Sequence, residues 1–165
     1  MGQASTSVYA GTGQAGQPGD TASAFSRVEG YVIEGDISVI PGQLLIQGTA
    51  DNQAKLATAA GGTYVGLVRL SNDRKIDIDL GTPEPYGQYD RVSCAVEQVW
   101  HALTEEAVAK GEQVYVRFTS GAGGSISGYC RNDADTASAE AINATFAETT
   151  TAAGIAKIKL HLEQV

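Results

Sequence analysis

Three glycines near the N-terminus, Gly11, Gly13 and Gly16, have the spacing of a nucleotide-binding motif, G-x-G-x-x-G. In dinucleotide-binding proteins this motif joins a buried strand to a helix, whose N-terminus then holds the pyrophosphate. Here small polar residues precede the glycines, and Pro18 and Gly19 follow them, which prevents a helix of useful length. We therefore interpret the motif as a coincidence in a glycine-rich segment.

The histidines and cysteines do not form a catalytic or metal-binding pattern. His101 has no cysteine or carboxylate at ligand spacing, and His161 falls on the polar side of an alternating segment. Cys94 and Cys130 fit neither a disulfide framework nor a zinc motif, so we expect buried free thiols. The sequence also lacks a G-x-S-x-G nucleophile motif. We predict that the protein is not an enzyme and has no catalytic residue, cofactor or metal.

Asn132, Asp133 and Asp135 group oxygen atoms of the kind that Ca²⁺ prefers. The segment lacks the further acidic ligands and the spacing of a calcium loop, so it predicts a solvated turn. Asn143 begins an N-glycosylation sequon. Because Met1 to Tyr9 is polar and has no apolar core, we expect no secretory signal that would make the sequon meaningful.

The elements that must position these residues are predicted to be strands, because apolar and polar residues alternate with a period of two. Helix signals are weak: Thr104 could cap a short turn that Gly111 ends, and residues 135–144 favour a surface helix or a loop. No sustained repeat is visible. The predicted strands lie in residues 28–33, 44–46, 63–70, 75–80, 91–100, 112–118 and 158–162.

Length and charge narrow the classes of function. The 165 residues suit one domain, and the net charge of −8 disfavours binding to nucleic acid or to anionic membranes. Residues 1–26 are dominated by small and polar side chains, with Val8, Tyr9 and Phe25 as the sizeable apolar ones. Such a segment cannot bury enough surface to fold alone, so we predict a flexible arm over residues 1–26 and a β domain over residues 27–165.

Seven segments, taken in order, resemble the structural cement proteins of tailed phages. They are GTGQAGQPGD (11–20), RVEGYVIEG (27–35), PGQLL (41–45), GGTYVGLVRL (61–70), VWHALTEEAVAKGEQVYVRFTSGAGG (99–124), GYCRNDADTA (128–137) and TFAETTTAAGIAKIKLHL (145–162).

This resemblance implies a cement (decoration) protein that binds the outside of a phage capsid and stabilises contacts between major capsid protein subunits. The major capsid protein is the implied partner, with synthesis in the host bacterial cytoplasm and a place on the exterior of the virion. We also expect self-association on the capsid, because exposed β edges and a loose arm allow neighbouring copies to pair. The expected fold is mainly β: one compact, β-tulip-like barrel or sandwich with an extended N-terminal arm. The family supplies no contact residues. From the arm's composition we expect Val8, Tyr9, Pro18, Phe25 and Arg27 to bind the capsid.

Two other functions stay open at this point. A virion-surface recognition module, either an adhesin or a carbohydrate-binding domain, would expose aromatic side chains, and Tyr86 and Tyr89 are the best candidates. We expect these two tyrosines to pack within a turn instead. A small β-barrel enzyme would need a deep pocket with strongly perturbed titratable groups.

Overall fold

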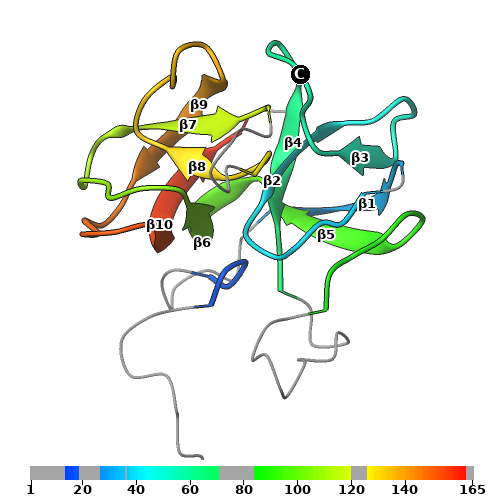
Figure 1. Cartoon of the computed structure of the whole chain (residues 1–165). Coiled ribbons are helices and arrows are strands. Elements are labelled where there is room, and N and C mark those ends of the chain that lie inside the picture. The colour runs from blue at the N-terminus through cyan, green and yellow to red at the C-terminus, as the bar shows by residue number, and fades with distance from the viewer. Residues whose placement is uncertain (1–13, 19–26, 36, 71–83, 120–125, 163–165) are drawn as a thin grey trace, which may run out of the picture.

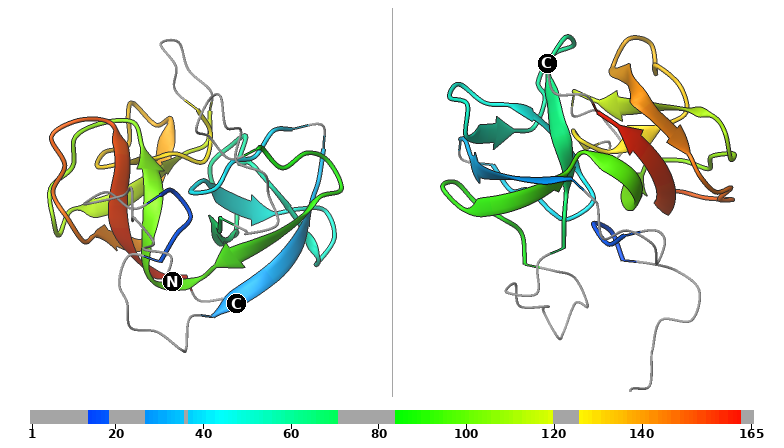
Figure 2. Two further views of the ribbon diagram at one scale, coloured as in Figure 1. Left: turned by 90° about the horizontal axis from the view of Figure 1, so that it is seen from below. Right: turned by 180° about the vertical axis from the view of Figure 1, so that it is seen from behind.

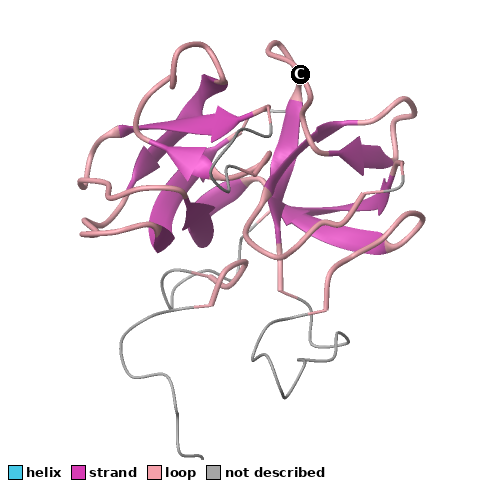
Figure 3. Ribbon diagram, viewed as in Figure 1, coloured by secondary structure: helices cyan, strands magenta, loops and turns pink. Residues whose placement is uncertain are grey.

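The computed structural model describes residues 14–18, 27–35, 37–70, 84–119 and 126–162. In these ranges the regular elements are all strands, joined by turns and loops, and there is no helix (Figure 3). The predicted mainly-β class is therefore confirmed. The described part of the chain accordingly offers no helix of a length and hydropathy that could cross a membrane. The strand predicted over residues 75–80 lies outside the described residues.

The first five strands close into a barrel in the order β1-β3-β2-β4-β5. Its core contains Ile33, Leu45, Val65 and Cys94, all almost fully buried. β4 is buried on both faces after its first residue, as the apolar residues of both parities predict. The strands are β1 (Val28–Ile33), β2 (Leu44–Gln47), β3 (Gln53–Lys55), β4 (Tyr64–Val68) and β5 (Arg91–Ala95).

The last five strands close into a second barrel in the order β10-β6-β8-β7-β9. Trp100, Phe146, Ile158 and Leu160 lie in its core. The alternation predicted at the C-terminus is confirmed, because Ile158 and Leu160 are buried while Lys159 is exposed. The strands are β6 (Glu97–Thr104), β7 (Gln113–Arg117), β8 (Cys130–Arg131), β9 (Ala139–Phe146) and β10 (Gly154–His161).

The two barrels lie side by side, where the sequence led us to expect one barrel or sandwich (Figures 1 and 2). Backbone hydrogen bonds cross between them: Leu103 N donates to Gly42 O at 3.1 Å, and Leu44 N donates to Gly128 O at 2.9 Å. Leu44 and Leu67 of the first barrel also pack into the core of the second. The seam between the barrels is therefore closed by both polar and apolar contacts.

Two predictions about individual segments are corrected by the structure. Residues 91–100 form two strands, not one: β5 belongs to the first barrel and β6 to the second, so Cys94 and Trp100 lie in different cores. Residues 139–144 belong to strand β9 and form neither a helix nor a loop. The alternation there was inconspicuous because two of its buried positions, at 139 and 144, are alanines. Thr104 ends β6 and caps no helix.

The barrels repeat one topology that the sequence does not show. In the first, β1 is parallel to β3 and antiparallel to β5; in the second, β6 is parallel to β8 and antiparallel to β10. β2 pairs with β3 and β4 just as β7 pairs with β8 and β9. β4 and β5 pair as β9 and β10 do. Each strand of one barrel therefore has an equivalent in the other.

A turn before the second strand of each barrel supports this equivalence. Gly42 N donates to Val68 O, at the end of β4, and Gly111 N donates to Phe146 O, at the end of β9; both distances are 2.8 Å. Both glycines have φ near +90°, a conformation that L side chains avoid. The sequence predicted that Gly111 ends a short turn, whereas the equivalence of the two turns was not predictable.

Candidate functional site

The arm residues that the structure describes, Gln14 to Pro18, lie against the edge of β6 at the seam. Gly16 N donates to His101 O at 2.7 Å, and His101 N donates to Gln17 O at 2.9 Å. Pro18 forms an antiparallel bridge with Trp100. Gly16 O accepts a hydrogen bond from Leu70 N, just after β4, at 3.0 Å. Residues 14–18 therefore add a short strand to one barrel while also bonding to the other.

Gly16 is the residue that this contact requires. Its φ is +76°, and a Cβ at this position would lie 2.6 Å from both Leu70 N and Val68 O. No side chain fits there, because the atoms in the way are backbone. Gly16 therefore has a packing role, which agrees with our interpretation that the nucleotide-binding spacing is coincidental. Gly11 and Gly13 lie outside the described residues.

The side chains beneath the docked segment are structural. His101 is buried, and its Nδ1 lies 3.2 Å from Gln17 O. Trp100 Nε1 donates to Glu97 O at 2.7 Å, and the Arg69 guanidinium lies 5.3 Å from the centre of the Trp100 ring. This geometry favours a cation–π contact. These bonds fix the surface on which the arm segment rests.

Of the five residues expected to bind the capsid, the structure describes Pro18 and Arg27, and both are exposed. Pro18 pairs with Trp100 in β6. Arg27 precedes β1, and its carbonyl oxygen accepts a hydrogen bond from Val96 N, between β5 and β6, at 3.2 Å. Arg27 therefore contacts the residue that connects the barrels, and Pro18 contacts the second barrel. Val8, Tyr9 and Phe25 lie outside the described residues.

A network of ion pairs occupies one side of the second barrel. Glu105 accepts hydrogen bonds from Arg117 Nε at 2.7 Å and from Arg131 Nη1 at 2.9 Å. Asp133 and Asp135 bind the same two arginines. Because these carboxylates are paired with cations, the segment is a salt-bridged turn and not a calcium loop. Among the described residues no group of three or more His, Cys, Asp or Glu could hold a metal.

The pKa values in this network favour permanent charge. Burial alone would lower the pKa of Arg131, but hydrogen bonds to Glu105 and Asp133 outweigh it, and the pKa is raised. The hydrogen bond from Arg131 lowers the pKa of Asp133. Groups held charged in this way are suited to fixing a fold and poorly suited to transferring protons. Sequence reasoning missed the network, since its members are far apart in the chain.

The two cysteines are buried and free, as predicted. Burial raises the pKa of Cys94 to about 12 and also raises that of Cys130. A thiol that keeps its proton at neutral pH is a poor nucleophile and a poor metal ligand. Both cysteines therefore act as small apolar residues in the cores.

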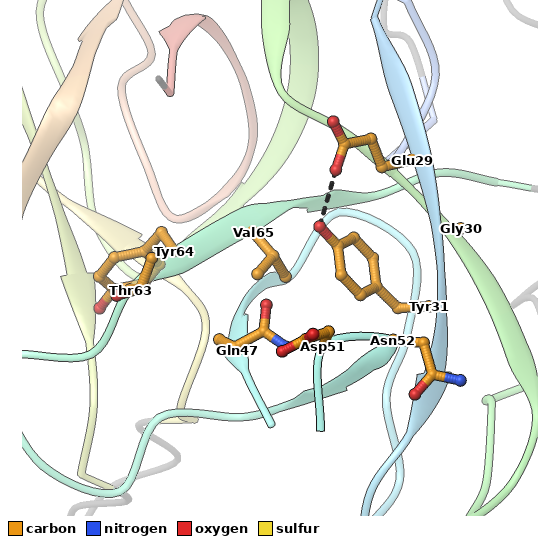
Figure 4. Close-up of a pocket in the computed structure, with 9 residues that line it drawn as sticks. All are labelled: Glu29, Gly30, Tyr31, Gln47, Asp51, Asn52, Thr63, Tyr64 and Val65. Atoms are coloured by element: carbon orange, nitrogen blue, oxygen red, sulfur yellow. Dashed lines mark hydrogen bonds between the residues drawn. The ribbon is translucent and has the colours of Figure 1, made fainter. Parts of the chain in front are cut away.

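A cavity of about 500 Å³ opens in the first barrel beside the first half of β1 (Figure 4). Tyr31 and Glu29 point into it from β1, and the Tyr31 hydroxyl donates to Glu29 Oε2 at 2.9 Å. Val65 lies across from them, and Gln47 and Asp51 lie along another side. The lining contains two carboxylates, of which Glu29 is paired with Arg27 at 2.8 Å, and no basic side chain, so it is unsuited to an anionic ligand.

The fold thus consists of two closed barrels, and the edge of β6 takes up an extended segment of the same chain. The chain belongs to the structural cement protein family: the family model described as "Structural cement protein (E217 gp24/Pam3 gp6)" matches residues 3–161. The predicted resemblance is therefore confirmed, and the protein is a structural component of a phage capsid.

A solved structure supports the fold. A chain in the capsid of Myoviridae phage XM1 superimposes with a TM-score of 0.69 over 89% of this chain and 89% of that chain. The two sequences are 16% identical, so this likeness concerns the fold alone. No relative was found among the curated proteins.

Proposed function

We propose that this protein binds the outer surface of a phage capsid and stabilises the contacts between major capsid protein subunits. The observation that carries the proposal is the family match over residues 3–161. The net charge of −8 favours the outer shell over an inner face that meets DNA. On this proposal the protein is made in the bacterial cytoplasm, acts on the virion exterior and associates with further copies there.

The arm, residues 1–26, is proposed to be the main capsid anchor, and residues 27–165 form the β domain. Within the arm, residues 14–18 hydrogen-bond to both barrels and so fix the arm at the seam. The part of the arm before Gln14 starts from this fixed point. Val8 and Tyr9 are the apolar side chains in that stretch best suited to fill recesses on a partner.

Binding of this kind stabilises a capsid by mass action. A ligand that binds only the assembled lattice stabilises each site by RT ln(1 + [L]/Kd), which is about 2.7 kcal/mol at a hundredfold excess over Kd. Bridging two subunits makes each site select the intact lattice, and many copies act together. Modest affinity at each site is therefore sufficient.

The test adds purified full-length protein to undecorated capsids and images them by electron cryomicroscopy. The wild-type protein should form an ordered outer layer. The triple variant Val8→Ala, Tyr9→Ala, Phe25→Ala should bind at least tenfold more weakly, because it loses the arm's apolar anchors. A control variant with three polar residues of the arm replaced, Ser5→Ala, Thr6→Ala and Ser23→Ala, should bind normally.

The outcomes separate two parts of the proposal. If the wild-type protein leaves the capsids bare, the capsid-binding function is wrong. If the wild-type protein and the triple variant bind equally well, the function stands and the arm is not the anchor.

A further inference from the structure

The internal repeat identifies a residue in the first barrel that matches the docking position in the second. Ile33 ends β1 and Thr104 ends β6, and each pairs with the parallel strand of its own barrel. Counting back three residues from each makes Gly30 equivalent to His101. The registers of β1 with β5 and of β6 with β10, together with those of β5 with β4 and of β10 with β9, also make Gly30 equivalent to His101.

At His101 the strand edge is occupied, whereas at Gly30 none of the described residues pairs with it. The His101 backbone N–H and C=O both bond to residues 14–18. Backbone N–H groups two residues apart on a strand point to the same side. Val32 N donates toward the β3 side, to Asn52 O at 2.8 Å, so the N–H of Gly30 also points to that side. The pairing with β3 begins only at Val32. The N–H and C=O of Gly30 therefore face the cavity, with no partner among the described residues.

The cavity beside Gly30 has room for a chain. It measures about 500 Å³, and Gly30 lines one side while Thr63, Tyr64 and Val65 line another. Figure 4 shows Tyr31 and Val65 at either side of the space. An extended peptide could pair with the backbone of β1 and lay alternate side chains into this cavity.

We propose that the open edge of β1 at Gly30 is a docking site for an extended segment of the major capsid protein. The segment adds beside β1 in the way that residues 14–18 add beside β6. This inference rests on the proposed capsid-binding function and names a second point of attachment. With the arm bound to one subunit and the β1 edge to another, a single protein bridges two subunits.

The chemistry of the site selects the occupant. The segment that fills the equivalent edge, Gln14 to Pro18, is uncharged, and its contact residue is a glycine. In the first barrel the cavity has Glu29 and Asp51 in its lining and no basic side chain, although Arg27, outside the lining, pairs with Glu29 at 2.8 Å. The fitting segment is therefore neutral or basic. A second copy of this chain, with its net charge of −8, is the less favourable partner.

Gly30 offers a matched pair of variants. A Cβ at Gly30 meets no atom within 4 Å and the φ is not in the left-handed region, so Gly30→Ala should keep both the fold and the N–H donor. Gly30→Pro removes the donor at an edge where no described residue forms a hydrogen bond with it, a position that tolerates proline. Gly30→Pro should weaken capsid binding about tenfold, which corresponds to one lost hydrogen bond, and Gly30→Ala should bind normally.

A second pair of variants covers the case in which Gly30→Pro fails to fold. Thr63 is exposed and lines the cavity, whereas Thr145 is exposed on β9 and does not line it. Thr63→Trp should fill the cavity and weaken capsid binding, and Thr145→Trp should leave binding unchanged. Hydrogen exchange provides a direct measurement: the Gly30 amide should exchange more slowly when the wild-type protein is bound to capsids.

These experiments distinguish this inference from the function on which it rests. If the wild-type protein binds capsids but Gly30→Pro and Thr63→Trp bind equally well, with no protection of the Gly30 amide, the docking site is wrong and the function stands. If the Gly30 amide becomes protected at high protein concentration without capsids, the occupant is a second copy and the proposal is overturned. A wild-type protein that does not bind capsids overturns both.

Discussion

Gly42 and Gly111 occupy the same position of one turn in the two barrels, with φ angles of +89° and +91°. They differ in their surroundings. A Cβ on Gly42 would lie 2.6 Å from Ala15 Cβ in the docked arm segment, whereas a Cβ on Gly111 would meet nothing within 4 Å. The two turns therefore have the same backbone geometry, but only the turn at Gly42 contacts the arm.

This pair allows the arm contact to be measured apart from backbone strain. Gly42→Ala and Gly111→Ala should each lower the free energy of unfolding by about 1–2 kcal/mol, because alanine is strained at positive φ. Only Gly42→Ala should also displace residues 14–18. The His101 amide, which donates to Gln17 O, should then exchange faster in Gly42→Ala than in Gly111→Ala. Equal exchange in both variants would contradict the contact.

Removing Arg117 should be far more costly than removing an exposed cation. The Arg117 and Glu105 side chains are 3% and 8% exposed, so Arg117→Ala leaves a buried carboxylate with fewer partners. We expect a loss of about 3–5 kcal/mol in the free energy of unfolding. Lys157→Ala, which removes a cation 37% exposed and 3.9 Å from Glu148, should cost less than about 1 kcal/mol. Denaturant unfolding of both variants tests this; similar losses would contradict the buried network.

Acid should weaken the contribution of Asp133. The hydrogen bond from Arg131 lowers the pKa of Asp133 below its ordinary 3.8. A carboxyl group whose pKa is lower in the folded state stabilises the fold above its unfolded pKa and loses this effect as the pH falls through the folded pKa. The difference in melting temperature between wild type and Asp133→Asn should therefore be constant near neutral pH and shrink below about pH 4. A difference that stays constant down to about pH 2 would contradict the ion pair.

Tyr89 carries backbone strain at the surface. Its φ is +69° and its side chain is 75% exposed, so little packing offsets the strain. Tyr89→Gly should therefore be neutral or slightly stabilising. Gln88→Gly, at the preceding exposed residue without positive φ, should cost about 0.5–1 kcal/mol. Thermal unfolding of the two variants is the test, and an equal loss in both would show that the strain is absent.

Much of the fold followed from local patterns in the sequence. The alternation around Val114 and Val116, and around Ile158 and Leu160, predicted β7 and β10 because one face of each strand is buried. The packing predicted for the tyrosine pair is half correct: Tyr86 is buried, whereas Tyr89 is exposed. The predicted state of both cysteines is confirmed. Local periodicity reports burial well where each strand has one face toward a core.

Relationships between distant residues were not predictable. Nothing near Val96 shows that the chain passes there from one barrel to the next, because the alternation of apolar residues continues through it. The docking of Gly16 depends on His101 and Leu70, which are far away in sequence. The repeat is invisible because equivalent positions such as Gly30 and His101 need only the same backbone directions and not the same side chains. Function was inferred from the ordered resemblance to a family, not from any chemical group.

The central claim is most directly tested by heating capsids. Capsids with and without the bound protein should be warmed, or stripped of divalent ions, and followed for DNA release. Because a ligand of the assembled state favours the intact lattice, decorated capsids should release DNA at a higher temperature and more slowly. The Gly30→Pro protein should give an intermediate result at equal concentration. If decorated and bare capsids release DNA at the same temperature and rate, the protein does not stabilise the capsid and the account is wrong.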